Sequence, residues 1–230
     1  MRNKIKTIAF DADDTLWVNE PYFQEAEHRF CVLLKDHLPA QAVSRELFQT
    51  EMKNISLYGY GIKGFMLCMI ETITRVSNGT APLQLIDEAL ALGHDLLQKP
   101  IELLPGVAET LEGLHGKYQL VIATKGDLLD QERKLKQSGL KDYFHHIEIM
   151  SNKQVTNYQK LLTHLDCSPG NFLMLGNSVK SDVLPVLALA AFAAHIPYHT
   201  TWMHEQHDDT IEHPNLITLT NIADILNHLD

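Results

Sequence analysis

Five short hydrophobic runs, each ending near glycine, aspartate, asparagine or proline, predict buried β-strands along the chain. They cover residues Ile5–Phe10, Tyr118–Ala123, His146–Ile149, Phe172–Leu175 and Ala191–Ile196. Segments with helical hydrophobic spacing separate the later runs, and the C-terminal residues Leu216–Leu219 and Ile222–Leu229 predict a further strand and a closing helix. Strands that alternate with helices predict parallel βαβ units joined by right-handed crossovers.

The interval from Trp17 to Lys99 breaks this alternation, because it contains no strand pattern and four successive helical patterns instead. The first begins at Pro21 and is stopped by Pro39, and the others cover about Gln41–Lys53, Ile62–Val76 and Leu83–Leu97. An insertion of this kind after the first strand predicts a helical subdomain at the carboxyl end of that strand.

Three carboxylates, at Asp11, Asp13 and Asp14, directly follow the first predicted strand. Ligands of open parallel sheets bind beyond the carboxyl ends of the strands. Residues two apart in an extended chain point to the same side, so we expect Asp11 and Asp13 to share one pocket. Such charges repel one another unless a cation lies among them, and carboxylate oxygens suit Mg²⁺. The alternative is a helix-capping cluster, but a cap needs only one acidic residue.

Three later strands end in polar groups that complement the carboxylates. The second strand leads into Thr124-Lys125-Gly126, whose hydroxyl and backbone N–H groups suit a phosphate oxygen. The third is followed by the ammonium group of Lys153, and the fourth by a polar segment from Gly176 to Asp182. Each of these alone is also compatible with a structural role: an ordinary strand-to-helix turn, an idle lysine, or a Ser or Asp N-cap of a helix that begins near Asp182. Their common position at the ends of successive strands favours a single site.

Taken together, these segments resemble the four motifs of the haloacid dehalogenase-like hydrolase superfamily, in order. The matching residues are Asp11-Ala12-Asp13-Asp14-Thr15-Leu16, Thr124-Lys125-Gly126, Lys153 and Gly176-Asn177-Ser178 with Ser181-Asp182. The resemblance implies an α/β fold, with a Rossmann-like doubly wound parallel-sheet core over residues 1–16 and 100–230. It also implies that residues 17–99 form a helical cap subdomain inserted after the first motif.

The resemblance implies a reaction through an aspartyl-phosphate. Asp11 is expected to be the nucleophile, and Asp13 the acid and base that serves the leaving alcohol and then the attacking water. Mg²⁺ is expected to be held by Asp11, by the backbone carbonyl of Asp13 and by Asp182. Asn177 stands where the family commonly has aspartate, so it is expected beside the metal with one less negative charge.

The same resemblance assigns phosphoryl binding to Thr124, to the backbone N–H of Lys125 and to the Lys153 ammonium. It also favours a phosphomonoester as substrate, since dehalogenases and phosphonatases of the superfamily lack the acid at the position of Asp13. A phosphomutase, or a non-catalytic phosphate-sensing or protein-binding module on the same fold, is the alternative. In the cap, the segment Tyr58–Gly64 with Lys63 is the expected specificity element, and a plain interhelical connection is the alternative reading of it.

The composition of this 230-residue chain limits the classes of partner that we expect for it. Its 19 Lys and Arg against 29 Asp and Glu give a formal net charge of −10, which disfavours nucleic acid as a partner. The longest apolar run, Val183–Ala194, is short of the roughly 20 residues of a membrane span. No apolar segment precedes Ile5, so we expect no signal peptide and a cytoplasmic protein. The histidines from His195 to His213 are expected to lie in a solvated connection. The sequence predicts no oligomeric state.

Overall fold

The computed structural model describes residues 4–207 and 209–229, and in these residues the predicted strands form one parallel sheet. The predicted core range also includes residues 1–3, 208 and 230, which lie outside the described residues. The sheet has six strands in the order β3-β2-β1-β4-β5-β6. They are β1 (Thr7–Phe10), β2 (Gln119–Lys125), β3 (His146–Met150), β4 (Phe172–Gly176), β5 (Phe192–His195) and β6 (Leu216–Thr218). This order is that of a Rossmann-like doubly wound sheet, which confirms the predicted fold class.

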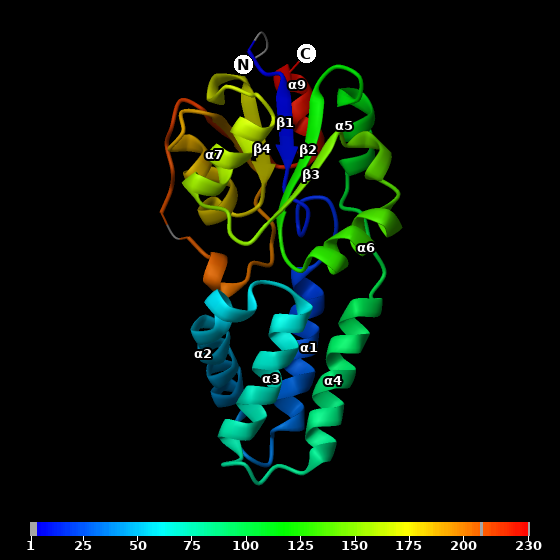
Figure 1. Ribbon diagram of the computed structural model, residues 1–230, viewed down its shortest axis with the longest axis vertical. Coiled ribbons are helices and arrows are strands. Elements are labelled where there is room, and N and C mark those ends of the chain that lie inside the picture. Colours follow the sequence, from blue (N-terminus) through cyan, green and yellow to red (C-terminus); the bar gives the residue numbers. More distant parts are fainter. Residues whose placement is uncertain (1–3, 208, 230) are drawn as a thin grey trace. The chain divides into compact units, whose positions relative to one another are not determined.

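Helices cover both faces of the sheet (Figure 1), which explains why its central strands read as continuous hydrophobic runs. One face packs against α5 (Val107–Leu114), α6 (Leu128–Ser138) and α9 (Leu226–Leu229). The other packs against α7 (Val155–His164) and α8 (Leu184–Leu187). Strand β1 lies at the centre of the sheet, and its residues Ile8, Ala9 and Phe10 are fully buried. Asp11, which follows β1, is held against β4, because its backbone N–H donates to the Leu175 carbonyl at 2.8 Å.

The chain divides into two compact units. The core unit contains Met1–Glu20, Ile101–Lys125 and Glu132–Asp230, and the helical unit contains Pro21–Pro100 with Gly126–Gln131. The helices of the second unit are α1 (Glu20–Leu33), α2 (Ala40–Tyr58), α3 (Ile62–Val76) and α4 (Leu83–Gln98). All four overlap predicted helices, but two ends differ. α1 ends at Leu33, before the predicted stop at Pro39, and α2 continues five residues beyond the predicted end at Lys53. The role of the helical unit as a cap remains a prediction.

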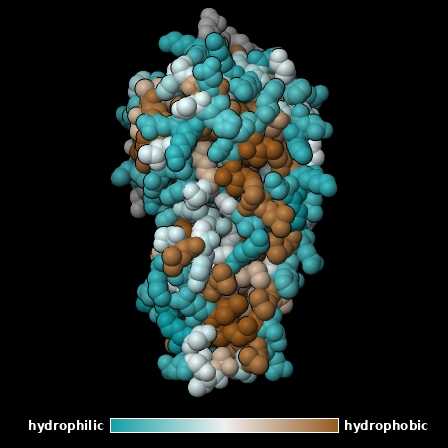
Figure 2. Space-filling view, in the orientation of Figure 1, coloured by the Kyte–Doolittle hydropathy of each residue, from teal (hydrophilic) through white to brown (hydrophobic). Residues whose placement is uncertain are grey.

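The helical unit has a hydrophobic core of its own. Its largest fully buried side chains come from α1, α2 and α3, and include Phe30, Leu47, Met69 and Ile73. Hydrophilic residues occupy much of the visible face of each unit, and hydrophobic patches are interspersed among these residues (Figure 2). Across residues 4–207 and 209–229, no helix combines the length and the apolar character that crossing a membrane requires.

Three local features differ from the sequence-based expectations. Helix α5 was not predicted, because it has only eight residues and begins after Gly106, whose φ of 85° lies in the left-handed region. The C-terminal segment begins as a 3₁₀ turn, Ile222–Ile225, before α9. A helix was expected to begin near Asp182, but a π-helical turn, Val179–Val183, precedes α8 there. Tyr158 of α7 holds this turn, since its hydroxyl donates a hydrogen bond of 3.0 Å to the Ser181 carbonyl.

Truncating Leu111 to alanine is expected to destabilise the protein by about 2–5 kcal/mol, because the side chain is fully buried between α5 and the sheet and its loss leaves a cavity. Chemical denaturation followed by circular dichroism measures the change in free energy of unfolding. The matched control is Leu83→Ala at the 81% exposed first residue of α4, which should cost less than about 0.5 kcal/mol. Equal effects of the two truncations would contradict the placement of α5.

Candidate active site

The polar residues predicted at the strand ends gather at the carboxyl edge of the sheet. Asp11 follows β1, Thr124 lies at the end of β2, and Lys153 follows β3. Asn177 and Asp182 follow β4, the second of them inside the π-helical turn. The side chains of Asp11, Lys153, Asn177 and Asp182 form one connected group of hydrogen bonds, which Thr15 completes. Thr124 is buried on the neighbouring strand β2.

Lys153 is the centre of this group. Its Nζ donates to Oδ1 of Asp11 at 2.5 Å and to Oδ1 of Asp182 at 2.7 Å, and all three side chains are buried. Burial alone would lower the pKa of Lys153, but the two carboxylates hold it above its usual range. Burial raises the pKa of Asp11 to about 7, even though the Lys153 ammonium lowers it. One ammonium group therefore serves two carboxylates, and a further positive charge would favour the ionised form of Asp11.

Thr15 and Asn177 connect the first and fourth motifs. The Thr15 hydroxyl lies 3.3 Å from both Oδ2 of Asp11 and Oδ1 of Asn177, and it accepts the backbone N–H of Asn177 at 3.1 Å. Asp182 is fixed from the other side, since its Oδ2 accepts the backbone N–H of Ser178 at 3.0 Å. A glycine is required at position 176, because a Cβ there would lie 2.2 Å from Asp182 Oδ2.

Asp13 is held by two donors that the sequence analysis did not identify. Its Oδ1 accepts the indole N–H of Trp17 at 2.7 Å and the ammonium of Lys134 at 2.9 Å. Lys134 is itself buried on α6 and also donates to Oδ1 of Asn19 at 2.8 Å. Asp13 is near enough to Asp11 to raise the pKa of that carboxyl further. Trp17 and Lys134 therefore fix the orientation of the second aspartate beside the first.

Asp14, the third carboxylate of the motif, has a structural role. Its Oδ1 accepts the backbone N–H groups of Asn19 and Glu20, at 2.9 Å and 3.1 Å, where α1 begins. Its φ of 61° lies in the left-handed region, which aspartate and asparagine tolerate better than most residues. The helix-capping alternative considered for the cluster thus applies to this one residue.

Glu205, in a 3₁₀ turn after β5, links the second and fourth motifs. It forms an ion pair with the Lys125 ammonium, and its Oε2 accepts the hydroxyls of Ser178 and, at 2.7 Å, of Ser181. Lys125 Nζ also donates to the Ser181 hydroxyl at 2.9 Å. Burial raises the pKa of Glu205, but Lys125 and these hydrogen bonds outweigh it and lower the pKa to about 2. The glutamate stays ionised and braces the turn that carries Asp182.

Replacing Glu205 by glutamine is expected to lower kcat/KM about 10–100-fold on any substrate found, because loss of its charge loosens both Lys125 and the serines beside Asp182. The measurement is steady-state kinetics over a range of Mg²⁺ concentrations, and the loss should be smaller at high Mg²⁺. The matched control is Glu212→Gln, an exposed glutamate after the same turn. Unchanged kinetics in the Glu205 variant would exclude the bracing role.

The structure also gives contacts for two other residues to which the sequence analysis assigned a role, Thr124 and Lys63. The Thr124 hydroxyl, among its interactions, lies 3.2 Å from the Lys125 carbonyl, and its role toward phosphate remains a prediction. In the helical unit, Lys63 pairs with Asp127, with Nζ to Oδ1 at 3.0 Å. Its expected role in specificity also remains a prediction.

The donor atoms of the site suit Mg²⁺. Asp11 and Asp182 supply carboxylate oxygens that converge on one ammonium group, and Asn177 adds an amide oxygen beside Thr15. The carboxyl groups of Asp11, Asp13 and Asp182 lie around the ammonium groups of Lys153 and Lys134. Oxygen ligands of this kind are the ones that a hard divalent cation takes, so Mg²⁺ fits the residues present.

The chain is similar to hydrolases of known structure. The profile of a hydrolase family described as haloacid dehalogenase-like hydrolase matches residues 5–188. A haloacid dehalogenase-like family hydrolase from Xanthomonas campestris is 34% identical with a TM-score of 0.88, and the match covers 98% of this chain and 90% of that one. No curated protein matches the chain.

Two more distant structures share the fold. A predicted phosphoglycolate phosphatase from Haemophilus somnus is 18% identical with a TM-score of 0.66, and the match covers 98% of both chains. A 2-haloacid dehalogenase from Pseudomonas syringae is also 18% identical, with a TM-score of 0.62 and 97% of both chains covered. Proteins named for two different reactions therefore share this fold, so the fold alone does not assign a reaction to the chain.

Proposed function

Because the chain belongs to the haloacid dehalogenase-like hydrolase family, we propose that it is a Mg²⁺-dependent phosphomonoester hydrolase acting on a small phosphorylated metabolite. The observation that carries this proposal is the pair of aspartates, Asp11 and Asp13. The first contacts Lys153 at 2.5 Å and the second is held by Trp17 and Lys134. A hydrolase that cleaves a phosphate ester needs both a nucleophile and an acid for the leaving alcohol.

In the proposed reaction, the Asp11 carboxylate attacks phosphorus and forms an aspartyl-phosphate while the ester oxygen leaves. Asp13 gives its proton to that oxygen, and then takes a proton from the water that hydrolyses the aspartyl-phosphate. The products are the alcohol and inorganic phosphate, and both aspartates return to their starting states. Splitting one difficult substitution into two easier steps is the advantage of the covalent route.

The remaining residues position the phosphoryl group. Lys153, Thr124 and the backbone N–H of Lys125 are proposed to bind its oxygens, and Trp17 and Lys134 to keep Asp13 in place. Mg²⁺, when bound, supplies positive charge that offsets the charge on the transferred group. Asp11, the backbone carbonyl of Asp13, and Asp182 are its proposed ligands, with Asn177 beside them.

The proposal is tested by measuring phosphate release from 4-nitrophenyl phosphate, and from a panel of sugar phosphates, nucleotides and small phosphorylated acids, with and without Mg²⁺. We expect Mg²⁺-dependent turnover of at least one compound. Halide release from short 2-haloacids is measured in parallel and is expected to be absent. Halide release without phosphate release would identify a dehalogenase instead. Conversion of a sugar phosphate into its isomer would identify a mutase. Absence of turnover on the whole panel would favour the non-catalytic module.

A further inference from the structure

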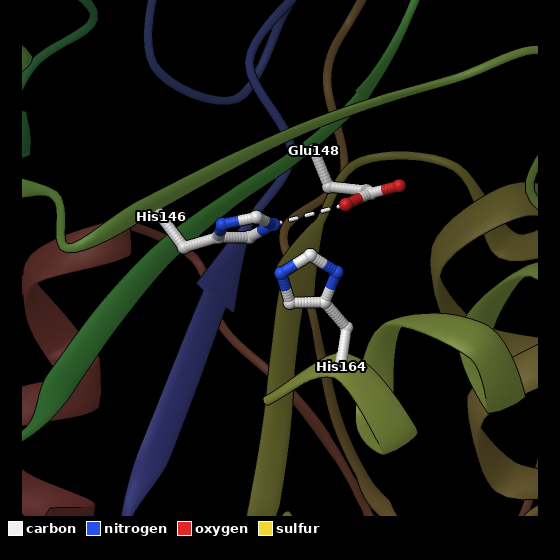
Figure 3. Close-up of side chains that lie close together, drawn as sticks. All are labelled: His146, Glu148 and His164. Atoms are coloured by element: carbon white, nitrogen blue, oxygen red, sulfur yellow. Dashed lines mark hydrogen bonds and ion pairs between the residues drawn. The ribbon is translucent and has the colours of Figure 1, made fainter. Parts of the chain in front are cut away.

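Two histidines and a glutamate, none of them part of the four motifs, gather on the core unit. Figure 3 shows the side chains of His146 and Glu148, from the edge strand β3, pointing toward that of His164 at the end of α7. His146 and Glu148 are two residues apart on the strand and therefore share a face of the sheet. Nε2 of His146 lies 2.9 Å from Oε2 of Glu148, and the ring centroids of His146 and His164 are 4.8 Å apart.

The spacing of these side chains approaches that of a metal site. Each residue offers one ligand atom, and the three atoms all lie within 4.8 Å of one another. Neighbouring ligands of a tetrahedral Zn²⁺ are about 3.3 Å apart, given metal–ligand bonds of about 2.0–2.1 Å. His146 and Glu148 are already closer than this, and His164 is exposed, so a small rotation of its side chain would complete the set.

We propose that His146, Glu148 and His164 bind a divalent transition-metal ion, with Zn²⁺ as the best match. Two imidazoles and one carboxylate favour Zn²⁺, Ni²⁺ or Cu²⁺ over Mg²⁺, which takes oxygen ligands. Three protein ligands leave a fourth position of the tetrahedron for water. None of these residues takes part in the proposed hydrolysis, so the inference does not depend on that function.

The positions of the three ligands in the chain imply that a bound ion would stabilise the fold around Lys153. Glu148 precedes Lys153 in the chain and His164 follows it, at the far end of α7. In the folded protein, an ion bound to both would link the two ends of the segment that carries Lys153. The ion binds the folded state because the unfolded chain does not hold the three ligands together. We therefore expect Zn²⁺ to raise the thermal unfolding temperature of the protein.

The experiment measures Zn²⁺ binding to the full-length protein after treatment with a chelator. Isothermal titration is carried out with saturating Mg²⁺, and repeated in an Asp182→Asn background that removes one carboxylate of the candidate active site. We expect one equivalent of Zn²⁺ to bind in both. His146→Ala and His164→Ala should each weaken binding by at least about tenfold, since loss of a ligand costs no less than loss of an outer-shell partner. The matched control is His37→Ala, an exposed histidine of the helical unit, which should leave affinity unchanged.

Two readouts separate a built site from adventitious binding. Co²⁺ in place of Zn²⁺ should give visible absorption bands typical of tetrahedral coordination, and these should disappear in both histidine variants. Circular dichroism in the absence of metal should show that the variants fold as the parent does. Absence of Zn²⁺ binding by the folded parent, or equal affinity in His146→Ala, His164→Ala and His37→Ala, would overturn the proposal.

Discussion

Replacing Asp11 by asparagine is expected to lower kcat for phosphomonoester hydrolysis by about 10⁴-fold or more, because the variant has no group to attack phosphorus. Asparagine has nearly the size and shape of aspartate, so the packing around β1 is preserved. Its carbonyl oxygen also still accepts a hydrogen bond from Lys153. The loss should therefore appear as a fall in kcat on every substrate of the panel. Phosphate release over a range of substrate concentrations with Mg²⁺ measures it.

Asp14→Asn is the matched control for this loss. Asp14 belongs to the same motif and is also buried, but its carboxylate accepts backbone N–H groups at the start of α1. Asparagine tolerates the left-handed φ of this position and keeps an oxygen acceptor. We expect less than about a tenfold loss of kcat, since the group only caps a helix. Equal losses at positions 11 and 14 would mean that a disturbed motif, and not a missing nucleophile, explains the effect.

The main elements of the fold could be predicted because hydrophobic pattern and burial agree in them. β1 and β4 are buried on both faces and read as continuous apolar runs, and α3 has the predicted bounds Ile62–Val76. Elements that depend on tertiary contacts could not be predicted from the hydrophobic pattern. α5 is too short to show a clear period, and the π-helical turn at Val179–Val183 is held by a hydrogen bond from Tyr158, about twenty residues earlier in the chain.

The candidate site divides in the same way. Residues in the segments after the strands could be located, because the parallel sheet brings Asp11, Lys153 and Asp182 together at one edge. The residues that hold these side chains in place could not be located from the sequence. Lys134 lies on a helix rich in charged residues, and Glu205 lies in a turn far from any motif. Their partners are set by the folded chain, and nothing in the local sequence separates them from solvated charges.

Replacing Lys153 by methionine is expected to lower kcat/KM by about 10³-fold, because a buried donor to the phosphoryl group and to Asp11 is lost. The pH profile should change as well. Asp11 has to be ionised to attack, so activity rises as the pH passes its pKa. Burial raises that pKa to about 7 and Lys153 opposes the rise, so the pKa should rise further in the variant. The acidic limb of the kcat/KM profile is therefore expected at higher pH, at a fixed Mg²⁺ concentration.

The same substitution should destabilise the protein in a pH-dependent way. Without Lys153, the buried carboxyl groups of Asp11 and Asp182 lose the ammonium group that they share, which costs about 3–5 kcal/mol when both are ionised. A carboxyl whose pKa is raised by folding binds a proton more readily in the folded state, so the folded variant gains stability as the pH falls. The difference in unfolding temperature from the parent should thus be larger at pH 8 than at pH 6.

Lys160→Met on the exposed face of α7 is the matched control for the loss of a lysine, and should move neither the pH profile nor the unfolding temperature. An unmoved acidic limb in Lys153→Met, together with a stability loss that does not depend on pH, would mean that the ammonium group does not set the charge of Asp11. A shifted acidic limb together with a pH-dependent stability loss would assign both effects to one contact. The ammonium group that offsets the charge of the buried carboxylates would then also keep the nucleophile ionised.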